Sequence, residues 1–485
     1  MGVEEKDTYA AEVENVKHDA SSTPPQQLED FDEKLAARIR HKIDLRLLPA
    51  LGAMYAICLL DRNNLSNAAV AGMNVELKME EGDNYNLVNM CFFITYITLQ
   101  PFAVLLCRWM GPRWFLPMIC VIWGSVIIGA GFSPNWQTLL GLRLILGALE
   151  CGFFPGCLYL LSTWYTRFES SRRYSIFYLL GSCVGSLGGI LAFGLQQLDG
   201  RGGLGGWRWI FIIEGVITGG IAIFALLYLV KFLDEELIRP SWKFLTRDEL
   251  EFVAARLNAD RGDVEVEPFT IKRFLEPATE WFIYGFPIIL MLTTALGYAF
   301  AFTLPIILQS SLGFGVAEAQ CLTAPPYFFS AILMYVAGWL SDKYRQRGLA
   351  IVILATIGLI GLPIMGWAKN PWVRYFGVFV SVGGANSTIP SVFAYQGTNI
   401  RGQWRRAFCS ASLTGLGGIG GIIGALIFRQ QDKPDYFPGF IACIVASVLI
   451  VITVGVMTIY FRRCNAECDR GERVLMGDPN FRFTI

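Results

Sequence analysis

The sequence predicts an all-α membrane protein whose twelve transmembrane helices form two six-helix bundles. The composition is the first observation behind this prediction, because 54% of the 485 residues are hydrophobic and only 16% are charged, against roughly 25% charged residues in soluble domains. The second is that the apolar residues occur in runs of about 20, the length that crosses a bilayer core of about 30 Å. The third is that a polar segment separates one set of these runs from another of equal number.

Each predicted span is an apolar run in one of the two halves. The first half contains spans near residues 46–70, 85–106, 114–132, 136–164, 173–198 and 207–231. The second half contains spans near residues 281–310, 319–340, 349–368, 371–396, 406–428 and 437–462. We therefore divide the chain into an N-terminal tail (1–45), a six-helix bundle (46–231), a linker (232–280), a second six-helix bundle (281–463) and a C-terminal tail (464–485).

The polar segments outside the spans have features of their own. The N-terminal tail begins without the apolar core of a secretory signal, so we expect it to be polar and disordered. In the linker, Thr246 and Glu249 form a capping-box pattern, which marks the start of a helix. Apolar residues follow at helical spacing: Leu250, Val253 and Leu257. We expect a short amphipathic helix against the membrane or the helix ends, either as a solvated connection or with a regulatory role.

Basic residues indicate how the chain is oriented. Lys and Arg are concentrated in the loops after even-numbered spans: Arg108, Arg113, Arg167, Arg172, Arg173, Lys343, Arg345, Arg347, Arg401, Arg405 and Arg406. The loops after odd-numbered spans carry fewer, and one of them contains the acidic run NVELKMEEGDNYN. Short cytoplasmic loops are enriched in Lys and Arg. The sequence therefore predicts that both termini are cytoplasmic, in agreement with an even number of spans.

The two halves resemble each other in sequence. The fifth span reads GSCVGSLGGILAFG and the eleventh reads LTGLGGIGGIIGALIF, and small residues of this kind let helices approach closely. The loops CRWMGPR and GWLSDKYRQRG, at matching places in the two halves, are both short and basic. Six spans repeated once are typical of a transporter whose binding site lies between its halves.

Ionisable residues inside the predicted spans are the candidate site. These residues are Asp61, Arg62, Arg143, Glu150 and Glu214. Each costs at least ~2.5–3.5 kcal/mol inside a spanning helix, so it needs a partner or a function. Arg143 and Glu150 are seven residues apart and therefore lie on one helix face, about 10 Å apart along the axis. Asp61 and Arg143 have similar predicted depths, so the two could form an ion pair.

Such a pair would leave Arg62 free to bind an anion. A guanidinium binds a carboxylate through two parallel hydrogen bonds, and a carboxylate removed from water takes up a proton more readily. A purely structural role, in which the charges hold helices together, is the alternative. The second half offers neutral polar groups that could orient a ligand: Tyr298, Asn386, Ser387, Tyr395, Gln396 and Asn399.

Several motifs resemble those of a known transporter family. GWLSDKYRQRG resembles the loop signature of the major facilitator superfamily, and Arg143 with Gly147 resembles its R-x-x-x-G element on the fourth helix. LLDRNNLSNA, GLRLILGALECGFFPGCLYLLSTWYTRFESSRR and WRWIFIIEG resemble the anion:cation symporter branch. Within that branch the chain is most similar to the fungal allantoate, nicotinate and pantothenate permeases, and the resemblance covers residues 45–465.

The resemblance implies a twelve-helix major facilitator fold that works by alternating access with proton coupling. At the matching positions, Asp61 and Glu150 would be protonated, Arg62 would bind the substrate carboxylate, and Arg143 would belong to the charge network at the substrate site. We add Tyr298 as a candidate for substrate binding in the second half, together with the amide of Asn386.

The loop signature implies a cytoplasmic gate. Gly338, Asp342 and Arg345 would hold this gate at the matching positions of the second half. The first-half copy departs from the pattern, because Cys107 stands near the place where an Asp is usual. The usual Gly-Asn pair of the first span is also replaced, by Ser66 and Asn67.

We expect from these observations proton-coupled uptake of a small organic anion across the plasma membrane, by a monomer without cofactor or metal. Nicotinate, allantoate, pantothenate, biotin-like acids, sugar acids and small peptides all remain open as substrates. An exporter or uniporter of the same fold and a non-transporting nutrient sensor are the alternatives. A membrane-embedded enzyme is disfavoured, because the only His residues, His18 and His41, precede the first span. The net charge of zero gives no indication of nucleic-acid binding.

Overall fold

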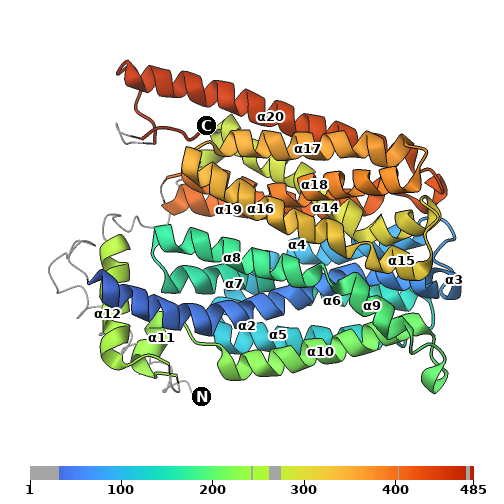
Figure 1. Cartoon of the computed structure of the whole chain (residues 1–485). Coiled ribbons are helices and arrows are strands. Elements are labelled where there is room, and N and C mark those ends of the chain that lie inside the picture. The colour runs from blue at the N-terminus through green and yellow to red at the C-terminus, as the bar shows by residue number, and fades with distance from the viewer. Residues whose placement is uncertain (1–31, 242–243, 262–274, 402, 477–480) are drawn as a thin grey trace.

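The computed structural model describes residues 32–241, 244–261, 275–401, 403–476 and 481–485. In these ranges twelve helices are long and apolar enough to cross a membrane, and they lie side by side in two groups (Figure 1). The predicted fold class is therefore confirmed. The prediction of a disordered N-terminal tail concerns mainly residues 1–31, which lie outside the described residues.

The first bundle is followed here from its N-terminal helix. It contains α2 (Glu33–Ala68), α4 (Asn84–Met110), α5 (Pro112–Ala130), α6 (Trp136–Glu150), α7 (Phe153–Trp164), α8 (Arg167–Gly185), α9 (Gly188–Gln196), the 3-10 turn η3 (Arg201–Gly203) and α10 (Gly206–Tyr228). α2 continues through a π-helical turn, η2 (Ala69–Met73), into α3 (Asn74–Glu76). Gly72 permits this turn, because its φ of 106° is one that residues with a side chain rarely adopt.

Two short helices and then the second bundle follow α10. The short helices are α11 (Leu233–Ile238) and α12 (Arg247–Arg261). The second bundle contains η4 (Glu276–Thr279), η5 (Trp281–Tyr284), α14 (Gly285–Ser310), α15 (Val316–Cys321), α16 (Ala324–Tyr344), α17 (Arg347–Trp367), α18 (Pro371–Asn399), α19 (Gln403–Ile427), η6 (Gln430–Asp432) and α20 (Phe437–Asp469).

Some helices differ from the predicted spans at their ends. α2 starts at Glu33 rather than near residue 46, and α20 continues to Asp469, past its predicted end. Hydropathy detects only the apolar part of a helix, so polar ends that project from the membrane are missed. The fourth span is interrupted at Cys151 and Gly152, between α6 and α7.

Close helix packing holds each bundle together. α5 packs against α10 and α2 against α8 in the first bundle, and α17 packs against α18 and α14 against α19 in the second. The bundles meet where α14 packs against α2, α19 against α4 and α16 against α8. As predicted, the Gly-rich spans make close approaches. A Cβ atom at Gly420 would lie 2.1 Å from Thr294 Oγ1, and one at Gly189 would lie 2.1 Å from the Gln320 carbonyl oxygen.

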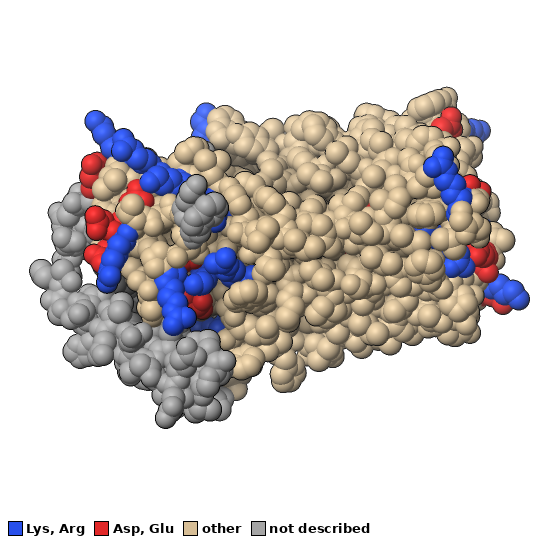
Figure 2. All heavy atoms as spheres, turned by 90° about the horizontal axis from the view of Figure 1, so that it is seen from below, with Lys and Arg blue, Asp and Glu red and all other residues tan. Residues whose placement is uncertain are grey.

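Charged side chains lie at the two ends of the molecule and leave a broad uncharged belt between them (Figure 2). α11 and α12 lie at one end, which we call the linker side, and α3 lies at the other, which we call the opposite side (Figure 1). Large apolar side chains such as Leu105, Ile223 and Leu227 are exposed between the two ends. Soluble proteins rarely expose such large apolar surfaces, so this belt is the surface that contacts lipid.

The predicted linker helix is present as α12. The capping box forms, since Thr246 N donates to Glu249 Oε2 over 3.1 Å and Glu249 N donates to Thr246 Oγ1 over 3.3 Å. The apolar residues predicted for its inner face are buried: Leu250, Val253 and Leu257. Glu169 on α8 binds Arg256 of α12 over 2.9 Å and also Arg40 of α2. α12 is therefore attached to the linker side of the first bundle.

The last described residues are bound to the linker side of the second bundle. Phe483 exchanges two backbone hydrogen bonds of 2.9 Å with the Asn465 amide on α20. Thr484 N donates to Asn399 Oδ1 of α18 over 2.7 Å, and Asn399 Nδ2 donates back to the Thr484 carbonyl over 3.1 Å. The Phe483 ring stacks on Phe461 with centroids 4.3 Å apart. This segment therefore joins α18 to α20.

Hydrogen bonds join the two bundles toward the opposite side. Ser66 Oγ of α2 donates to the Ala301 carbonyl of α14 over 3.0 Å. Tyr85 of α4 donates to the Phe302 carbonyl over 2.5 Å. Gln320 Nε2 of α15 donates to the Asn67 carbonyl over 3.2 Å. These contacts, made with backbone carbonyls, join the two bundles on the opposite side.

Candidate functional site

The ionisable residues predicted for the site are all buried inside the molecule. Asp61 and Arg62 on α2 are 1% and 7% exposed, Arg143 and Glu150 on α6 are 5% and 0% exposed, and Glu214 on α10 is 3% exposed. None of the five points into lipid. The low exposure means that their mutual electrostatic interactions are weakly screened by water.

Arg62 and Glu150 form an ion pair. Arg62 Nε donates to Glu150 Oε2 over 3.2 Å, and Cys58 Sγ donates to the same oxygen over 3.3 Å. Arg62 NH1 donates to the Tyr298 hydroxyl over 2.7 Å, which connects α2 to α14 of the second bundle. Arg62 is thus bonded to both halves of the molecule at once.

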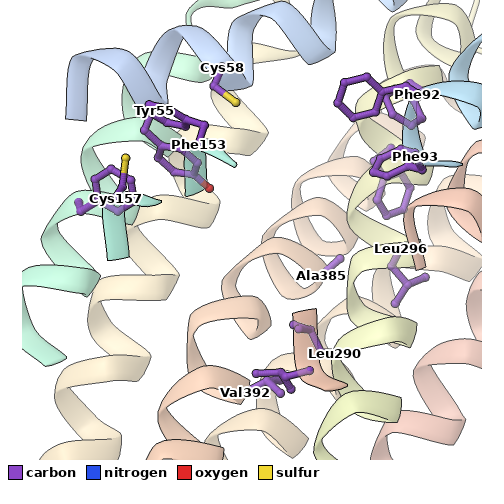
Figure 3. Close-up of a cluster of buried hydrophobic side chains, with 14 of the residues drawn as sticks. Tyr55, Cys58, Phe92, Phe93, Phe153, Cys157, Leu290, Leu296, Ala385 and Val392 are labelled. Atoms are coloured by element: carbon purple, nitrogen blue, oxygen red, sulfur yellow. The ribbon is translucent and has the colours of Figure 1, made fainter. Parts of the chain in front are cut away.

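Aromatic rings surround this ion pair. The Arg62 guanidinium lies over the rings of Phe92 and Tyr96, at 5.6 and 5.3 Å from their centroids, where cation–π attraction operates. Figure 3 shows Phe92 and Phe93 together on α4, and Tyr55 and Cys58 on α2 beside α7. The Tyr298 ring packs edge-on against Phe93 with centroids 4.8 Å apart. The site therefore has flat apolar walls on its first-bundle side.

The pairing differs from the one that the sequence allowed. Asp61 does not pair with Arg143; its Oδ2 accepts from Trp123 Nε1 over 3.2 Å and from Thr218 Oγ1 over 3.4 Å. Consecutive helix residues point about 100° apart, so Asp61 faces α5 and α10 while Arg62 faces α6 and the second bundle. The estimate from the sequence compared depth along the helices and had no information on this direction.

Arg143, not Arg62, is the arginine without a partner. Within the described part of the chain it makes no ion pair and no hydrogen bond, although Glu150, Asp61 and Tyr85 act on it electrostatically. The expectation that Arg62 would carry the unmatched charge is therefore wrong for this conformation. A buried cation of this kind is suited to an anionic ligand.

In the second half, the structure brings Tyr298 into the site and places Asn386 beside it. Asn386 Nδ2 donates to the Val382 carbonyl of its own helix over 3.3 Å. Its Oδ1 lies close to Gly297, since a Cβ atom there would be 3.3 Å away. Asn386 therefore neighbours the turn of α14 that carries Tyr298, and its amide oxygen faces that helix.

The predicted gate residues lie at the linker-side end of α16. Asp342 binds Arg347 over 2.8 Å, and Arg345 ends α16 with a left-handed backbone at φ 54°. Gly338 has open space around it. In the first half, Cys107 is buried, and a Cβ atom at Gly156 would lie 3.3 Å from its sulfur. Packing therefore takes the place of an ion pair in that loop.

The sequence analysis missed several partners of the charged residues. Cys58 precedes Arg62 by one helical turn and Thr218 follows Glu214 by one turn, so the sequence shows that each lies on the same helix face as a charged residue. It does not show that Cys58 bonds Glu150 or that Thr218 bonds Asp61. Trp123, which bonds Asp61, comes from α5 and had no such local signal.

Comparison with known proteins places the chain in a family. Residues 51–425 match the family model of the Major Facilitator Superfamily. The chain belongs to the Major Facilitator Superfamily. A member of this superfamily from Penicillium expansum, the MFS-type transporter cnsO, is 33% identical over 419 residues, which cover 85% of this chain and 80% of that protein. The high-affinity nicotinic acid transporter of Saccharomyces cerevisiae is 27% identical over 481 residues, covering 95% of this chain and 87% of that protein.

Solved structures of superfamily members show the same fold. A bacterial homolog of the human lysosomal transporter Spinster, in an inward-facing and occupied conformation, aligns with a TM-score of 0.61 at 15% identity, over 86% of this chain and 96% of that one. The xylose transporter XylE from E. coli, in a partially occluded inward-open conformation, aligns with a TM-score of 0.64 at 13% identity, over 86% and 99%. This superfamily member is therefore a multi-pass membrane protein of the transporter fold.

Proposed function

We propose that the chain is a secondary active transporter that takes up a small organic anion together with protons, by alternating access across the plasma membrane. The observation that carries the proposal is the buried Arg62–Glu150 pair at the contact between the two bundles, with the unpartnered Arg143 on the same helix as Glu150. A relative named as a nicotinic acid transporter supports an organic acid as the substrate.

Protonation of Glu150 is the central step of the proposed mechanism. While Glu150 is ionised, it occupies Nε of Arg62. A proton on Glu150 removes this charge and releases the guanidinium, which then binds the substrate carboxylate in its place. The site thereby exchanges one carboxylate for another and keeps its total charge. Arg143 supplies a second positive charge to the bound anion.

Tyr298 links substrate binding to movement of the bundles. Its hydroxyl accepts a hydrogen bond from Arg62 NH1. A movement of the Arg62 guanidinium therefore changes a contact between the two bundles. When a substrate carboxylate accepts hydrogen bonds from both Nε and NH1 of Arg62, the hydrogen bond from NH1 to Tyr298 is released or transferred to the ligand. Asn386, next to the same turn of α14, would orient the part of the ligand that carries no charge.

The orientation follows from the basic residues. The loops after even-numbered spans, which carry Arg173, Lys343 and Arg405 among other basic residues, lie on the linker side (Figure 1), and the positive-inside rule supports a cytoplasmic location for that side. The hydrogen bonds that join the two bundles on the opposite side would then close the exterior. The conformation described is one that would release substrate toward the cytoplasm, with Gly338, Asp342 and Arg345 at the gate there.

Proteoliposome transport tests this function. Purified protein is first screened by thermal unfolding against nicotinate, allantoate, pantothenate and sugar acids, because a ligand that binds the folded state raises the unfolding temperature. The stabilising acid is then supplied with an inward proton gradient. Wild type should accumulate it above the external concentration, whereas Asp61→Asn and Glu150→Gln should equilibrate it only. Accumulation at wild-type level in both variants would refute the coupling roles, and efflux without uptake would favour an exporter.

A further inference from the structure

Two buried acidic side chains of the first bundle, Glu214 and Asp61, take no part in the Arg62–Glu150 ion pair. Glu214 of α10 is 3% exposed and Asp61 of α2 is 1% exposed. Asp61 acts electrostatically on Glu214, and Thr218, one turn after Glu214, donates to Asp61 Oδ2. The sequence singled out Glu214 as a charge within a span, but neither the resemblance nor the proposed anion site gives it a role.

The Glu214 carboxyl has no strong partner. Neither of its oxygens takes part in a hydrogen bond with a described residue, and the same holds for Asp61 Oδ1. The Asn64 amide approaches Glu214 without reaching hydrogen-bond geometry, and its own oxygen also lacks a described partner. Both Glu214 oxygens and Asp61 Oδ1 are therefore buried without a hydrogen bond from a described residue, and the Asn64 amide beside Glu214 has an unpartnered Nδ2 as well as an unpartnered Oδ1.

The helices around Glu214 offer no counter-charge among the described residues. α10 packs against α5, α2, α9 and η2. The titratable groups that these elements turn toward the acidic pair are Asp61 from α2 and the buried Cys120 thiol from α5. Arg143 and Glu150 of α6 also act electrostatically on Asp61, but neither of them acts on Glu214. α9 and η2 contain no titratable side chain. The charged neighbour of Glu214 is therefore another acid.

This arrangement favours a proton on the pair. An ionised carboxylate can only accept hydrogen bonds, whereas a protonated one can also donate. Burial of a charge without a counter-ion is strongly unfavourable, and two adjacent carboxyls disfavour a second negative charge. A protonated Glu214 avoids both penalties, because it carries no charge and its O–H group can donate to a neighbouring acceptor such as the unpartnered Asn64 oxygen.

We propose that Glu214 is a second proton-binding residue of the transport cycle, which passes its proton to Asp61. This inference rests on the proposed proton-coupled function. In the transfer, the O–H bond at Glu214 breaks and an O–H bond forms at Asp61 Oδ1, so the pair keeps a total charge of minus one. Thr218 holds the two helices in place, since its hydroxyl lies 2.8 Å from the Glu214 carbonyl oxygen and 3.4 Å from Asp61 Oδ2.

The opposite side offers an entry for this proton. Trp207 Nε1 donates to Glu76 Oε2 over 2.5 Å, and Arg208 binds the same carboxylate over 2.7 Å. The Glu76 side chain is 45% exposed, so it is in contact with the solvent on that side. Glu214 lies about 9 Å further along α10 than Arg208, at ~1.5 Å per residue. We expect the proton to enter along α10 from this side, separately from the anion.

Infrared difference spectroscopy tests the protonation state without any ligand. The purified full chain is titrated from neutral to alkaline pH, and the carbonyl-stretch band of protonated carboxyl groups is followed. The wild type should show a band at neutral pH that Glu214→Gln removes and Asp61→Asn shifts in frequency. Glu81→Gln, which changes an exposed acid in the same way, should leave the band unchanged. An identical band in wild type and Glu214→Gln would overturn the inference.

Transport measurements then separate this inference from the proposed function. With nicotinate as the first probe, Glu214→Gln should lose at least tenfold in proton-driven accumulation while it retains exchange of internal for external nicotinate. Glu214→Asp, which keeps the carboxyl, should recover part of the accumulation. Wild-type accumulation by Glu214→Gln would overturn the inference and leave the proposed function intact. If wild type transports none of the screened acids, the proposed function fails, and the spectroscopic result still decides whether Glu214 binds a proton.

Discussion

At the scale of single residues, the two buried arginines of the site differ in what they bond. Arg62 is paired with Glu150 and bonded to Tyr298, whereas Arg143 has no described partner. Removal of one member of a buried pair leaves the other charge uncompensated, which typically costs 3–5 kcal/mol. Removal of an unpartnered charge carries no such penalty. The two arginines should therefore respond differently to the same substitution.

We expect Arg62→Ala to lower the unfolding temperature more than Arg143→Ala does, because only Arg62→Ala leaves Glu150 without its cation. Both variants should lose anion binding, which needs positive charge. The double variant Arg62→Ala with Glu150→Gln should recover stability without recovering binding. Thermal unfolding in detergent measures the first effect, and stabilisation by the screened carboxylate measures the second. Equal unfolding temperatures for the two single variants would contradict the assigned pairing.

The sequence located the charged residues of the site but not their partners. Hydropathy and span ends gave the depth of Asp61 and Arg143 along their helices, and depth alone allowed a pair. The direction in which a side chain points depends on helix rotation, which the packing against α5 and α10 decides. Trp123 shows the limit clearly, since nothing in its local sequence connects it to Asp61.

At the scale of elements, α12 is held to the first bundle by a charge network around Glu169. Burial alone would raise the pKa of Glu169, but the hydrogen bonds from Arg40 and Arg256 outweigh burial and hold its pKa below the usual value for Glu. A carboxyl with a lowered pKa in the folded state stabilises the fold above its unfolded pKa. This contribution is lost as the pH falls through the lowered value.

Acidification through the lowered pKa of Glu169 should therefore loosen α12 from the bundle. We expect Glu169→Gln to give the same loosening already at neutral pH and to abolish its dependence on acid. Hydrogen exchange of the α12 amides, followed by mass spectrometry, measures this. Glu251→Gln, which removes an exposed acid on α12 itself, is the matched control and should exchange like wild type. Protection of α12 in Glu169→Gln that equals wild-type protection would show that the network does not hold the helix.

Glycines in α19 set its distance from α14. A Cβ atom at Gly420 would come within 2.2 Å of the Met291 carbonyl oxygen, whereas one at Gly415 would meet nothing within 4 Å. We expect Gly420→Ala to destabilise the protein by about 1–3 kcal/mol through overpacking. Gly415→Ala on the same helix should be neutral or stabilising, because Gly in a helix is unfavourable by roughly 0.5–1 kcal/mol relative to Ala. Denaturant unfolding of the two variants compares them directly, and equal stability would contradict the close packing.

The Gly-rich pattern of the fifth and eleventh spans predicted these close contacts correctly. The break between α6 and α7 was not predictable in the same way, because both pieces are apolar and hydropathy joins them. A Cβ atom at Gly152 would lie 2.8 Å from Ala103 and 2.9 Å from Phe115. The tight packing of Gly152 against α4 and α5 is a tertiary feature, which no local pattern reveals.

At the scale of the whole molecule, the two bundles are joined on the opposite side. Lys433 and Glu80 form an ion pair between the bundles there, over 3.1 Å, and their side chains are 30% and 51% exposed. The pair is accessible to reagents from solution. In the proposed alternating-access cycle, this pair must separate once in every turnover.

A flexible cross-link between Glu80→Cys and Lys433→Cys should therefore stop transport. We expect a bismaleimide to abolish uptake in proteoliposomes while carboxylate binding from the linker side persists. The control combines Arg429→Cys with Asp432→Cys, two residues of one loop whose Nε and Oδ2 atoms are 3.2 Å apart. A cross-link between these two cysteines should leave uptake unchanged. Both single-cysteine variants must also be tested, since the chain has 12 cysteines of its own. Full uptake by the Glu80–Lys433 cross-linked protein would show that the opposite side does not open.

The segment around Phe483 has a consequence for how the second bundle can move. Asn399 ends α18 and Asn465 lies near the end of α20. The two side-chain amides hydrogen-bond the backbone of adjacent residues, Thr484 and Phe483. The linker-side ends of α18 and α20 are thereby connected, so neither end can move away from the other without breaking these hydrogen bonds. We therefore expect the linker-side ends of α18 and α20 to move together whenever the second bundle moves relative to the first.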